Sequence, residues 1–280
     1  MSLITPITQE KIRAYLEVFV EKKVEDILQR QLPRYMDPTA YLSLVSTKGR
    51  LKPFHAAIVP EEILRINAFE RSFSTTLGTT FEECARLIAL DHHLYAERGY
   101  DLTGKISTTA LNEIERQISY FDRTGNDATS GLTLASMIDA VLAVPHSADF
   151  LVQRTVRADL YIQTKDGTEL FFELKSPKPN KGQCLEVTQR ILRFHALRQQ
   201  NRPKVKAYFA MAYNPYGPSR DDYRWSIPKK YMPFTDGVVI GEEFWRLVGG
   251  PGTYHELLEI YQSVGKAKSK YMIDALAFGF

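Results

Sequence analysis

Three charged residues in two nearby segments could together carry out hydrolytic chemistry. Asp159 lies in RADLYIQ, and Glu173 and Lys175 close ELFFELK a few residues later. Carboxylate oxygens are the ligands that Mg²⁺ prefers, and a cation beside them can act on an attacking water. The three side chains are what a metal-dependent phosphodiesterase needs, provided that the fold brings them together.

The spacing of the two segments predicts a β-hairpin, and the length of its turn decides which side chains meet. A two-residue turn at Asp166 and Gly167 would pair Asp159 with Leu174, which places the two carboxylates on opposite faces. A three-residue loop ending with Gly167 in the left-handed region pairs Asp159 with Glu173 instead. We predict the three-residue loop, because its register also makes the opposite face wholly apolar, so that the sheet can pack directly on a helix.

The same register makes further predictions along the hairpin. It pairs Arg157 with Lys175 and Tyr161 with Phe171. The opposite face then becomes wholly apolar and can pack directly on a helix; its residues are Ala158, Leu160, Ile162, Leu170, Phe172 and Leu174.

A structural explanation of these charges is also available. Glu-x-Lys is common, and an Asp beside a Lys is usually a surface ion pair. Two features favour the catalytic interpretation. The flanking residues are strongly hydrophobic, so charges there need a reason to exist. A basic run follows as well: between Lys175 and Lys206 there are nine Lys or Arg residues and a single acid, Glu186. Such an excess favours a polyanion, although a solvated helix face is the simpler alternative.

The composition places the chain among ordinary globular proteins. Apolar residues make up 44% and charged residues 25% of the 280 positions. Cys84 and Cys184 lack metal-ligand spacing, which argues against a zinc site or a disulfide scaffold and suits a reducing cytosol. The start has no signal-peptide pattern, and the apolar segment LASMIDAVLAV is too short to span a bilayer. We expect an intracellular soluble protein with no membrane partner.

The periodicity of apolar residues predicts a mixed α/β fold, in which helices flank a mixed central sheet and the N-terminal half is mainly helical. The stretch 34–60 is expected to be irregular. A strand–helix–strand order in the middle of the chain predicts a parallel strand pair. The predicted helices are 8–31, 60–72, 80–97, 108–121, 131–143, 183–199 and a helix near 254–264, and the predicted strands are 156–163, 169–175, 205–213 and the segment GVVIG.

This order of elements resembles the PD-(D/E)xK nuclease core. Asp159 is followed by Glu173-Leu174-Lys175 on the next strand, then by a helix and a parallel strand; Ala158 stands where Pro usually precedes the Asp. The continuation ELKSPKPNKGQ and the upstream FERSFSTTLGTTFEECARLIA are similar to type II restriction endonucleases of the TdeIII-like group. The resemblance implies a single restriction-endonuclease-like domain over 1–280, with a mainly helical part (1–150), a catalytic core (151–213) and a C-terminal recognition or accessory part (214–280).

The resemblance also implies roles for individual residues. Asp159, Glu173 and the backbone carbonyl of Leu174 would hold Mg²⁺, and Lys175 would lower the pKa of the attacking water or orient it. The expected reaction is hydrolysis of DNA, leaving a 5′-phosphate and a 3′-hydroxyl. Many such nucleases add a Glu from an early helix, here Glu82 or Glu83. Thr80-x-x-Glu83 matches a capping box, which would give Glu83 a structural task, so we favour Glu82.

Sequence recognition is expected from outside this core. In the loop 213–231, Arg could grip guanine and Asp could accept from cytosine, although any one of these residues could equally belong to a solvated loop. Candidate contacts to double-stranded DNA are Lys178, Asn180, Lys181, Arg190, Arg193, Arg220, Asp222, Arg224, Lys229 and Lys230. A palindromic, GGNCC-like target, as the group resemblance implies, requires a two-fold homodimer. The place of action would be the cytoplasm of a bacterial or archaeal cell.

Competing motifs and functions are less well supported. GYDLTGK (99–105) is a near match to a phosphate-binding loop, but Ile106 replaces the required Ser or Thr, so we predict no nucleotide cofactor. A structure-specific repair or junction nuclease on the same core is one alternative function. A non-catalytic DNA-binding module is another, and the presence of Asp159, Glu173 and Lys175 together argues against it.

Overall fold

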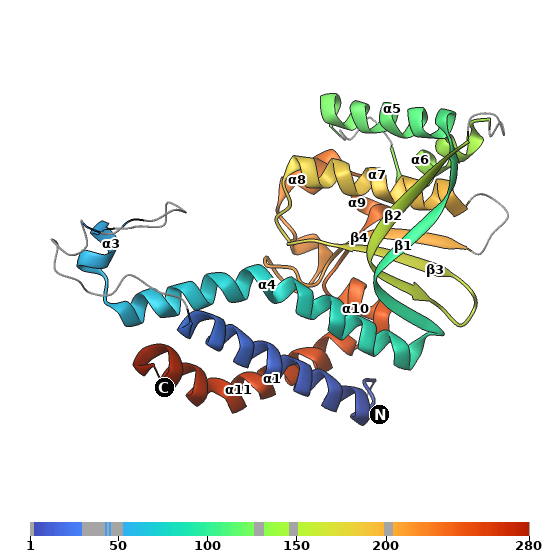
Figure 1. Cartoon of the computed structure of the whole chain (residues 1–280). Helices are drawn as coiled ribbons and strands as arrows, with labels where there is room; N and C mark the ends of the chain where they lie inside the picture. Colours follow the sequence, from blue (N-terminus) through green and yellow to red (C-terminus); the bar gives the residue numbers. More distant parts are fainter. Residues whose placement is uncertain are drawn as a thin grey trace. The chain divides into compact units, whose positions relative to one another are not determined.

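A five-stranded mixed sheet carries the predicted hairpin (Figure 1). The computed structural model describes residues 3–29, 43, 45, 53–125, 132–145, 151–198 and 204–279. The strands lie side by side in chain order: β1 (Tyr95–Ser107), β2 (Leu151–Gln163), β3 (Glu169–Leu174), β4 (Val205–Met211) and β5 (Val238–Ile240). The pairs β1–β2 and β2–β3 are antiparallel, whereas β3–β4 and β4–β5 are parallel. The predicted mixed α/β class and the parallel crossover from β3 to β4 are both confirmed.

Helices account for most of the remaining described residues. No described helix is long and apolar enough to cross a membrane. The α-helices are α1 (Pro6–Leu28), α3 (Pro53–Ile58), α4 (Glu61–His92), α5 (Thr108–Thr124), α6 (Leu134–Ala143), α7 (Lys181–Arg198), α8 (Ser226–Tyr231), α9 (Phe234–Gly237), α10 (Glu242–Gly249) and α11 (Thr253–Ile273), joined by a 3₁₀ turn at Arg220–Asp222 and a π-helical segment at Asp274–Phe278.

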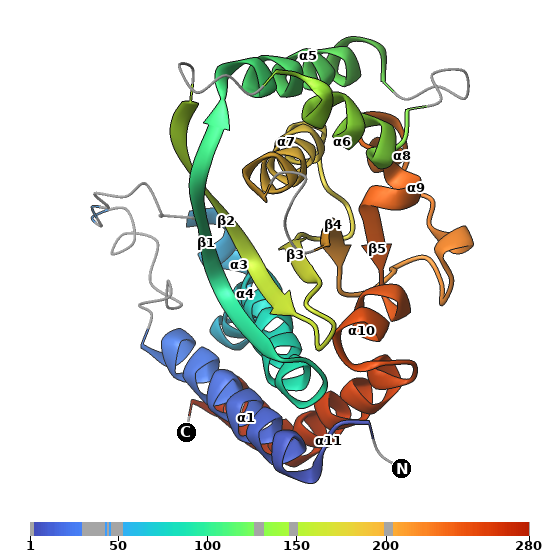
Figure 2. The same cartoon turned by 90° about the vertical axis from the view of Figure 1, so that its right-hand side faces the viewer.

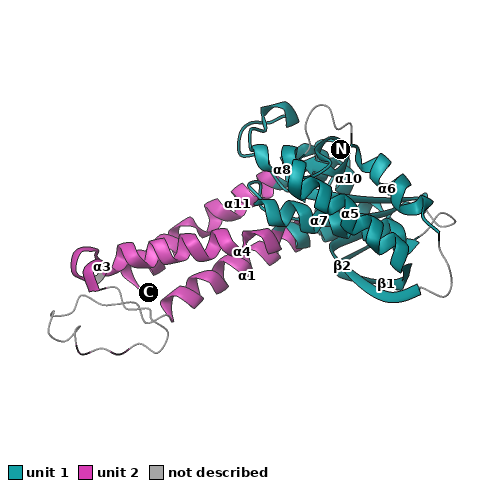
Figure 3. Ribbon diagram, turned by 90° about the horizontal axis from the view of Figure 1, so that it is seen from above, with its two compact units in different colours: residues 1–8, 81–257 teal, residues 9–80, 258–280 magenta. Residues whose placement is uncertain are grey.

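The chain forms two compact units (Figure 3). Unit 1 comprises residues 1–8 and 81–257 and contains the whole sheet. Unit 2 comprises residues 9–80 and 258–280 and is helical. In unit 2, Phe19 of α1 lies 5.5 Å from Phe73 of α4, and Lys268 of α11 pairs with Glu21 of α1 at 2.5 Å. The predicted catalytic residues therefore all belong to unit 1.

The register of the β2–β3 hairpin is the predicted one. Tyr161 pairs with Phe171, and the ladder ends at Leu160 with Phe172, so the predicted pairing of Asp159 with Glu173 is the next step of the same register. The backbone N–H of Thr164 donates to the Thr168 carbonyl at 2.9 Å, which leaves three residues in the loop. Gly167 closes that loop with a φ of 82°. The predicted pairing of Arg157 with Lys175 lies beyond the end of this ladder.

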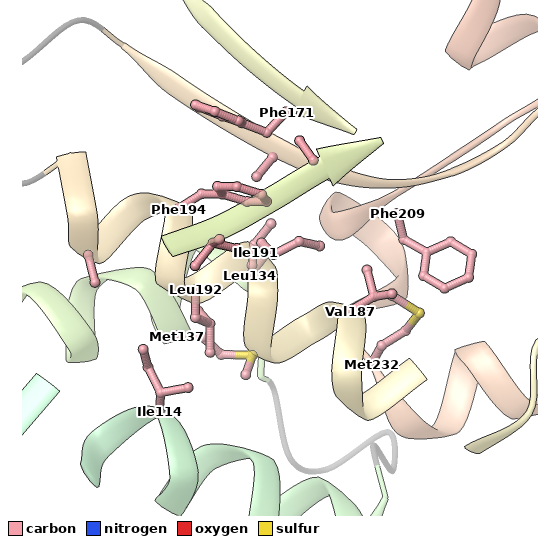
Figure 4. Close-up of a cluster of buried hydrophobic side chains, with 14 of the residues drawn as sticks. Ile114, Leu134, Met137, Phe171, Val187, Ile191, Leu192, Phe194, Phe209 and Met232 are labelled. Atoms are coloured by element: carbon pink, nitrogen blue, oxygen red, sulfur yellow. The ribbon is translucent and has the colours of Figure 1, made fainter. Parts of the chain in front are cut away.

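Both faces of the hairpin are buried, not one face alone. Phe171 stacks on Phe194 of α7 with ring centroids 4.5 Å apart, inside a core that α5 and α6 complete (Figures 2 and 4). On the opposite face, Phe172 meets Phe244 of α10 edge-on at 5.4 Å. The predicted apolar face thus packs on a helix as expected, but that helix, α10, was not anticipated from the sequence.

The prediction of two helices at 60–72 and 80–97 is wrong, because α4 is continuous from Glu61 to His92. The Ser/Thr-rich stretch between the two predicted segments is helical. In the structure its hydroxyls donate to carbonyls of the preceding turn: Thr75 to Arg71 at 2.7 Å and Thr76 to Ser72 at 2.8 Å. Bonds of this kind let Ser and Thr remain in a helix without competing for its backbone.

Strand β1 was also missed, and the rejected phosphate-loop match lies inside it. Alternation was present in this stretch: Leu102 and Ile106 are buried, while Asp101, Thr103 and Lys105 are exposed. The near match to a phosphate-binding loop at 99–105 covers this period-two pattern, so the strand was not predicted. Parts of several predicted elements lie outside the described residues. They are most of the irregular stretch 34–60, residue 131 of the helix 131–143, residues 30–31 of the helix 8–31 and residue 199 of the helix 183–199.

Gly167 offers a clean test of the hairpin register. A Cβ built there meets nothing within 4 Å, so a larger residue would feel only the positive φ. Gly167→Val should lower the free energy of unfolding by about 1–2 kcal/mol, the usual cost of a left-handed residue. Gly167→Asn should cost less, because Asn tolerates this region. Equal effects of Val and Asn in urea unfolding would contradict the assigned loop.

Candidate active site

Asp159, Glu173 and Lys175 meet at one edge of the sheet. The Nζ atom of Lys175 lies 3.4 Å from Oδ2 of Asp159 and 3.4 Å from Oε2 of Glu173. The backbone N–H of Leu174 donates to the same Asp159 oxygen at 2.8 Å. Lys175 itself is held by its backbone N–H, which donates to the carbonyl of Ala210 on β4 at 3.0 Å. The hairpin and the parallel strand beside it thus bring the three predicted residues together.

Asp159 stands where the pairing of β1 with β2 is interrupted. Arg98 pairs with Leu160 and Tyr100 with Ala158, but Gly99, which has a φ of 62°, makes no regular pair with Asp159. Ala158 and Tyr161 belong to the same core although they are three residues apart, so the alternation of β2 changes phase beside Asp159.

Glu173 is the most deeply buried member of the site. Its side chain is 0% exposed, against 27% for Asp159. Burial, reinforced by the negative charge of Asp159, raises the pKa of Glu173 to about 7, although Arg190 and Lys175 act in the opposite direction. Arg190, on α7, donates to Oε2 of Glu173 at 2.9 Å and to Glu186 at 2.5 Å. A buried carboxylate is tolerated only when such partners compensate it.

The arrangement fits a magnesium ion. Oε1 of Glu173 is buried and has no hydrogen-bond partner, which is unusual for a carboxylate oxygen and leaves it free to act as a ligand. Among the described residues, no group of three or more His, Cys, Asp and Glu side chains is placed to hold a metal ion. Mg²⁺ commonly takes only one or two carboxylates and completes its shell with water and substrate phosphate. Two carboxylates beside a lysine therefore suit Mg²⁺ better than a fully protein-ligated metal.

The argument that separated Glu82 from Glu83 is wrong. Thr80 lies in the middle of α4, where its hydroxyl donates to the Leu77 carbonyl at 2.6 Å, so it does not cap a helix that begins there. Both glutamates instead bind Arg98 of β1, at 2.9 Å for Glu82 and 3.3 Å for Glu83. Arg98 is adjacent to Gly99 in β1, so these two ion pairs connect both glutamates to the strand that lies beside Asp159. Among the described residues, no hydrogen bond or ion pair joins either glutamate to Asp159, Glu173 or Lys175, and the role of Glu82 remains a prediction.

The predicted contacts after Lys175 lie on a short loop and the start of α7. Lys178 is exposed and its Nζ lies 5.4 Å from the ring centre of Tyr216. Asn180 begins α7: its side chain accepts from the Gln183 N–H at 2.9 Å, and the Gln183 side chain accepts in return at 3.0 Å. Lys181 binds Asp122 at 2.7 Å.

Arg190 and Arg193 both turn towards acids of the protein. Arg190 joins the candidate site through Glu173, so the structure adds it to the trio. Arg193 reaches Glu115 of α5 at 3.4 Å, and its buried Nε has no hydrogen-bond partner. The contact of these two arginines with DNA remains a prediction.

The segment 213–231 contains both engaged and exposed charges. Arg220 binds Glu243 at 2.7 and 2.6 Å and donates to the carbonyls of Phe234 and Val238, so it works within the protein. Asp222 accepts from the N–H and hydroxyl of Ser219 at 3.0 and 2.9 Å, which stabilises the 3₁₀ turn. Arg224 and Lys230 are exposed, and Lys229 is exposed although its Nζ donates to the Tyr223 carbonyl at 2.7 Å.

The sequence did not predict that two residues of this segment contact the loop next to Lys175. Tyr223 and Trp225 donate hydrogen bonds to the loop that follows Lys175. The signal was the clustering of aromatic residues among the charges, but nothing in the sequence paired them with that loop.

The fold and the meeting of these three side chains are those expected of a nuclease, and comparison with known proteins shows the class. Residues 10–265 match the family model described as type II restriction endonuclease, HinfI. The type II restriction enzymes HgiBI and HgiEI of Herpetosiphon aurantiacus are each 52% identical over 273 residues, covering 98% of both chains. The type II restriction enzyme MjaII of Methanocaldococcus jannaschii is 24% identical, covering 98% of this chain and 73% of that protein. The chain belongs to the HinfI family of type II restriction endonucleases, which hydrolyse phosphodiester bonds.

The raised pKa of Glu173 predicts how stability depends on pH. Below its ordinary value of 4.5 the carboxyl is protonated in both states, and between 4.5 and about 7 only the folded protein keeps the proton. The folded state is therefore penalised progressively as the pH rises through this window, because ionisation is opposed by burial. Glu173→Gln removes the titration, so the variant should gain stability relative to the wild type between about pH 5 and about pH 8. A stability difference in urea unfolding that stays constant or shrinks with rising pH would contradict this.

Proposed function

We propose that Asp159, Glu173 and Lys175 form a Mg²⁺-dependent active site that cuts both strands of duplex DNA. The observation that carries the proposal is the meeting of two carboxylates and one ammonium group, with Lys175 at 3.4 Å from each carboxylate. The unpartnered Oε1 of Glu173 supports the presence of a cation between the two acids. The PD-(D/E)xK resemblance seen in the sequence supports the same assignment.

In this proposal each side chain has a distinct task. Asp159, Oε1 of Glu173 and the Leu174 carbonyl would hold the ion, and a bound ion would stabilise the negative charge that builds up on the phosphate. Lys175 orients the attacking water through its ammonium group. The water oxygen forms a bond to phosphorus and gives up a proton, the bond from phosphorus to the 3′-oxygen breaks, and that oxygen gains a proton, so that the water supplies both the new P–O bond and, in net terms, the proton of the 3′-hydroxyl. The products are a 5′-phosphate and a 3′-hydroxyl.

Contacts to DNA are proposed for the exposed residues around this edge. Lys178 and Asn180 follow Lys175 directly, and both side chains are exposed. Arg224, Lys229 and Lys230 are exposed in the segment 213–231 and are the stronger candidates there for base or phosphate contacts. For Arg220 and Asp222 we propose a structural role, since a DNA contact would require them to give up bonds within the protein. Lys181, Arg190 and Arg193 would reach phosphate only by sharing or leaving their present acidic partners.

Broader features of the enzyme follow from its expected target. A short palindrome is read most simply by a two-fold homodimer, and restriction of foreign DNA places the enzyme in the cytoplasm. We further propose that the two compact units act as one restriction-endonuclease-like domain. The finer grouping with TdeIII-like enzymes remains a prediction from the segments 69–89 and 173–183.

Asp159→Ala tests the proposed active site. Loss of one of two metal-binding carboxylates should abolish Mg²⁺-dependent cutting of plasmid DNA, by at least about a thousandfold, while specific binding in Ca²⁺ persists. Asp139→Ala on α6 is the matched control, because Asp139 is exposed and lies outside the site. Retained cutting by Asp159→Ala would refute the assignment. A smear or a preference for branched DNA, in place of discrete wild-type bands, would refute site-specific cleavage.

A further inference from the structure

Two aromatic side chains donate hydrogen bonds to the loop that follows Lys175. We call residues 176–180 the proline loop, after Pro177 and Pro179. The hydroxyl of Tyr223 donates to the Pro177 carbonyl at 2.6 Å, and Nε1 of Trp225 donates to the Pro179 carbonyl at 2.8 Å. Tyr223 is 0% exposed, so its bond is fully shielded from water. Each bond joins positions 46 residues apart in the chain.

These two hydrogen bonds give the proline loop a buried side and an exposed side. Pro177 and Pro179 are buried, whereas Ser176, Lys178 and Asn180 are exposed. Proline has a fixed φ and no N–H, so these residues stiffen the loop and leave its carbonyls as the groups that can be held. Since both held carbonyls belong to the buried residues, the three polar side chains are presented outward beside Lys175.

The residue between the two donors is exposed. In the order Tyr223-Arg224-Trp225, the outer two side chains hold the proline loop, and Arg224 points to the surface. A shift of the backbone at Arg224 would therefore pull on both bonds at once. The proline loop is connected to Lys175 without an intervening residue, so the pull would reach the ammonium group that contacts both carboxylates.

We propose that Tyr223 and Trp225 are positioning residues that couple DNA contact by Arg224 to the placement of Lys175. The inference rests on the proposed function, because it assigns Lys175 to catalysis and Arg224 to the duplex. When Arg224 meets the correct base pair, the two hydrogen bonds hold the proline loop, and hence Lys175, in the productive position. Small displacements of a catalytic group cost large factors in rate, so such coupling favours cutting at the correct site.

The test compares cognate and near-cognate cleavage. The cognate site is first obtained by sequencing the ends that the wild type produces, and the near-cognate duplex differs from it by one base pair. Tyr223→Phe and Trp225→Phe keep an aromatic ring but remove the donor. Tyr216→Phe is the matched control: the Tyr216 ring lies 5.7 Å from that of Tyr223, and the substitution keeps it.

Single-turnover rates decide between coupling and a merely structural role. We expect each donor variant to lower the cognate cleavage rate about tenfold, because the loss of one hydrogen bond weakens the positioning of Lys175. The near-cognate rate should stay within about threefold of the wild-type rate. The discrimination ratio should then fall, while the control changes neither rate and duplex binding in Ca²⁺ is retained.

The contrary outcomes are distinct. Equal loss at both sites in the two donor variants would mean that the bonds only stabilise the fold, and unchanged rates would mean that they do not matter for catalysis. Either result overturns the coupling while leaving the proposed function intact. Absence of any Mg²⁺-dependent cutting by the wild type would overturn the proposed function and the coupling with it.

Discussion

The proposed active site contains a buried carboxylate whose negative charge must be compensated by neighbouring cations. Glu173 lies at the end of a strand with both faces covered, next to a second carboxylate, and its raised pKa reflects that burial. Arg190 and Lys175 supply the compensating charge. Arg190 can do so only because α7 is fixed on the sheet, where Phe194 stacks on Phe171 (Figure 4). Core packing and the electrostatics of the site are therefore linked, because loosening α7 would remove Arg190, which compensates the buried charge of Glu173.

The same principle explains much of the basic run after Lys175. Several of its members neutralise acids of the protein: Arg190 binds Glu173, Arg193 binds Glu115, and Lys181 binds Asp122. At the far end of the hairpin, Arg198 binds Glu169 at 2.6 Å. The local excess of positive charge in the sequence is thus partly neutralised by acids from other elements. Among the described members of the run, exposed residues such as Lys178 could bind a polyanion without rearrangement.

Local patterns were enough to predict the hairpin and the trio. The position of Gly167, together with alternation in the two strands, determined the register, and the register placed Asp159 opposite Glu173. Features that depend on distant partners were not predictable in this way. Arg220 resembled a base reader until Glu243 was seen beside it, and Thr80 resembled a helix cap although α4 begins at Glu61. Strand β1 was not predicted, because a near match to a phosphate-binding loop covered its period-two pattern; its pairing with β2 is interrupted at Gly99, opposite Asp159.

The central claim is that Asp159 and Glu173 share one metal ion beside Lys175. Its most direct test is anomalous scattering from crystals of the protein with its cognate duplex and Mn²⁺ in place of Mg²⁺. The account predicts a peak within ligand distance of Asp159 and of Oε1 of Glu173, next to the phosphate that is cut. A peak that involves neither carboxylate, or intact density for both with no metal between them, would contradict it.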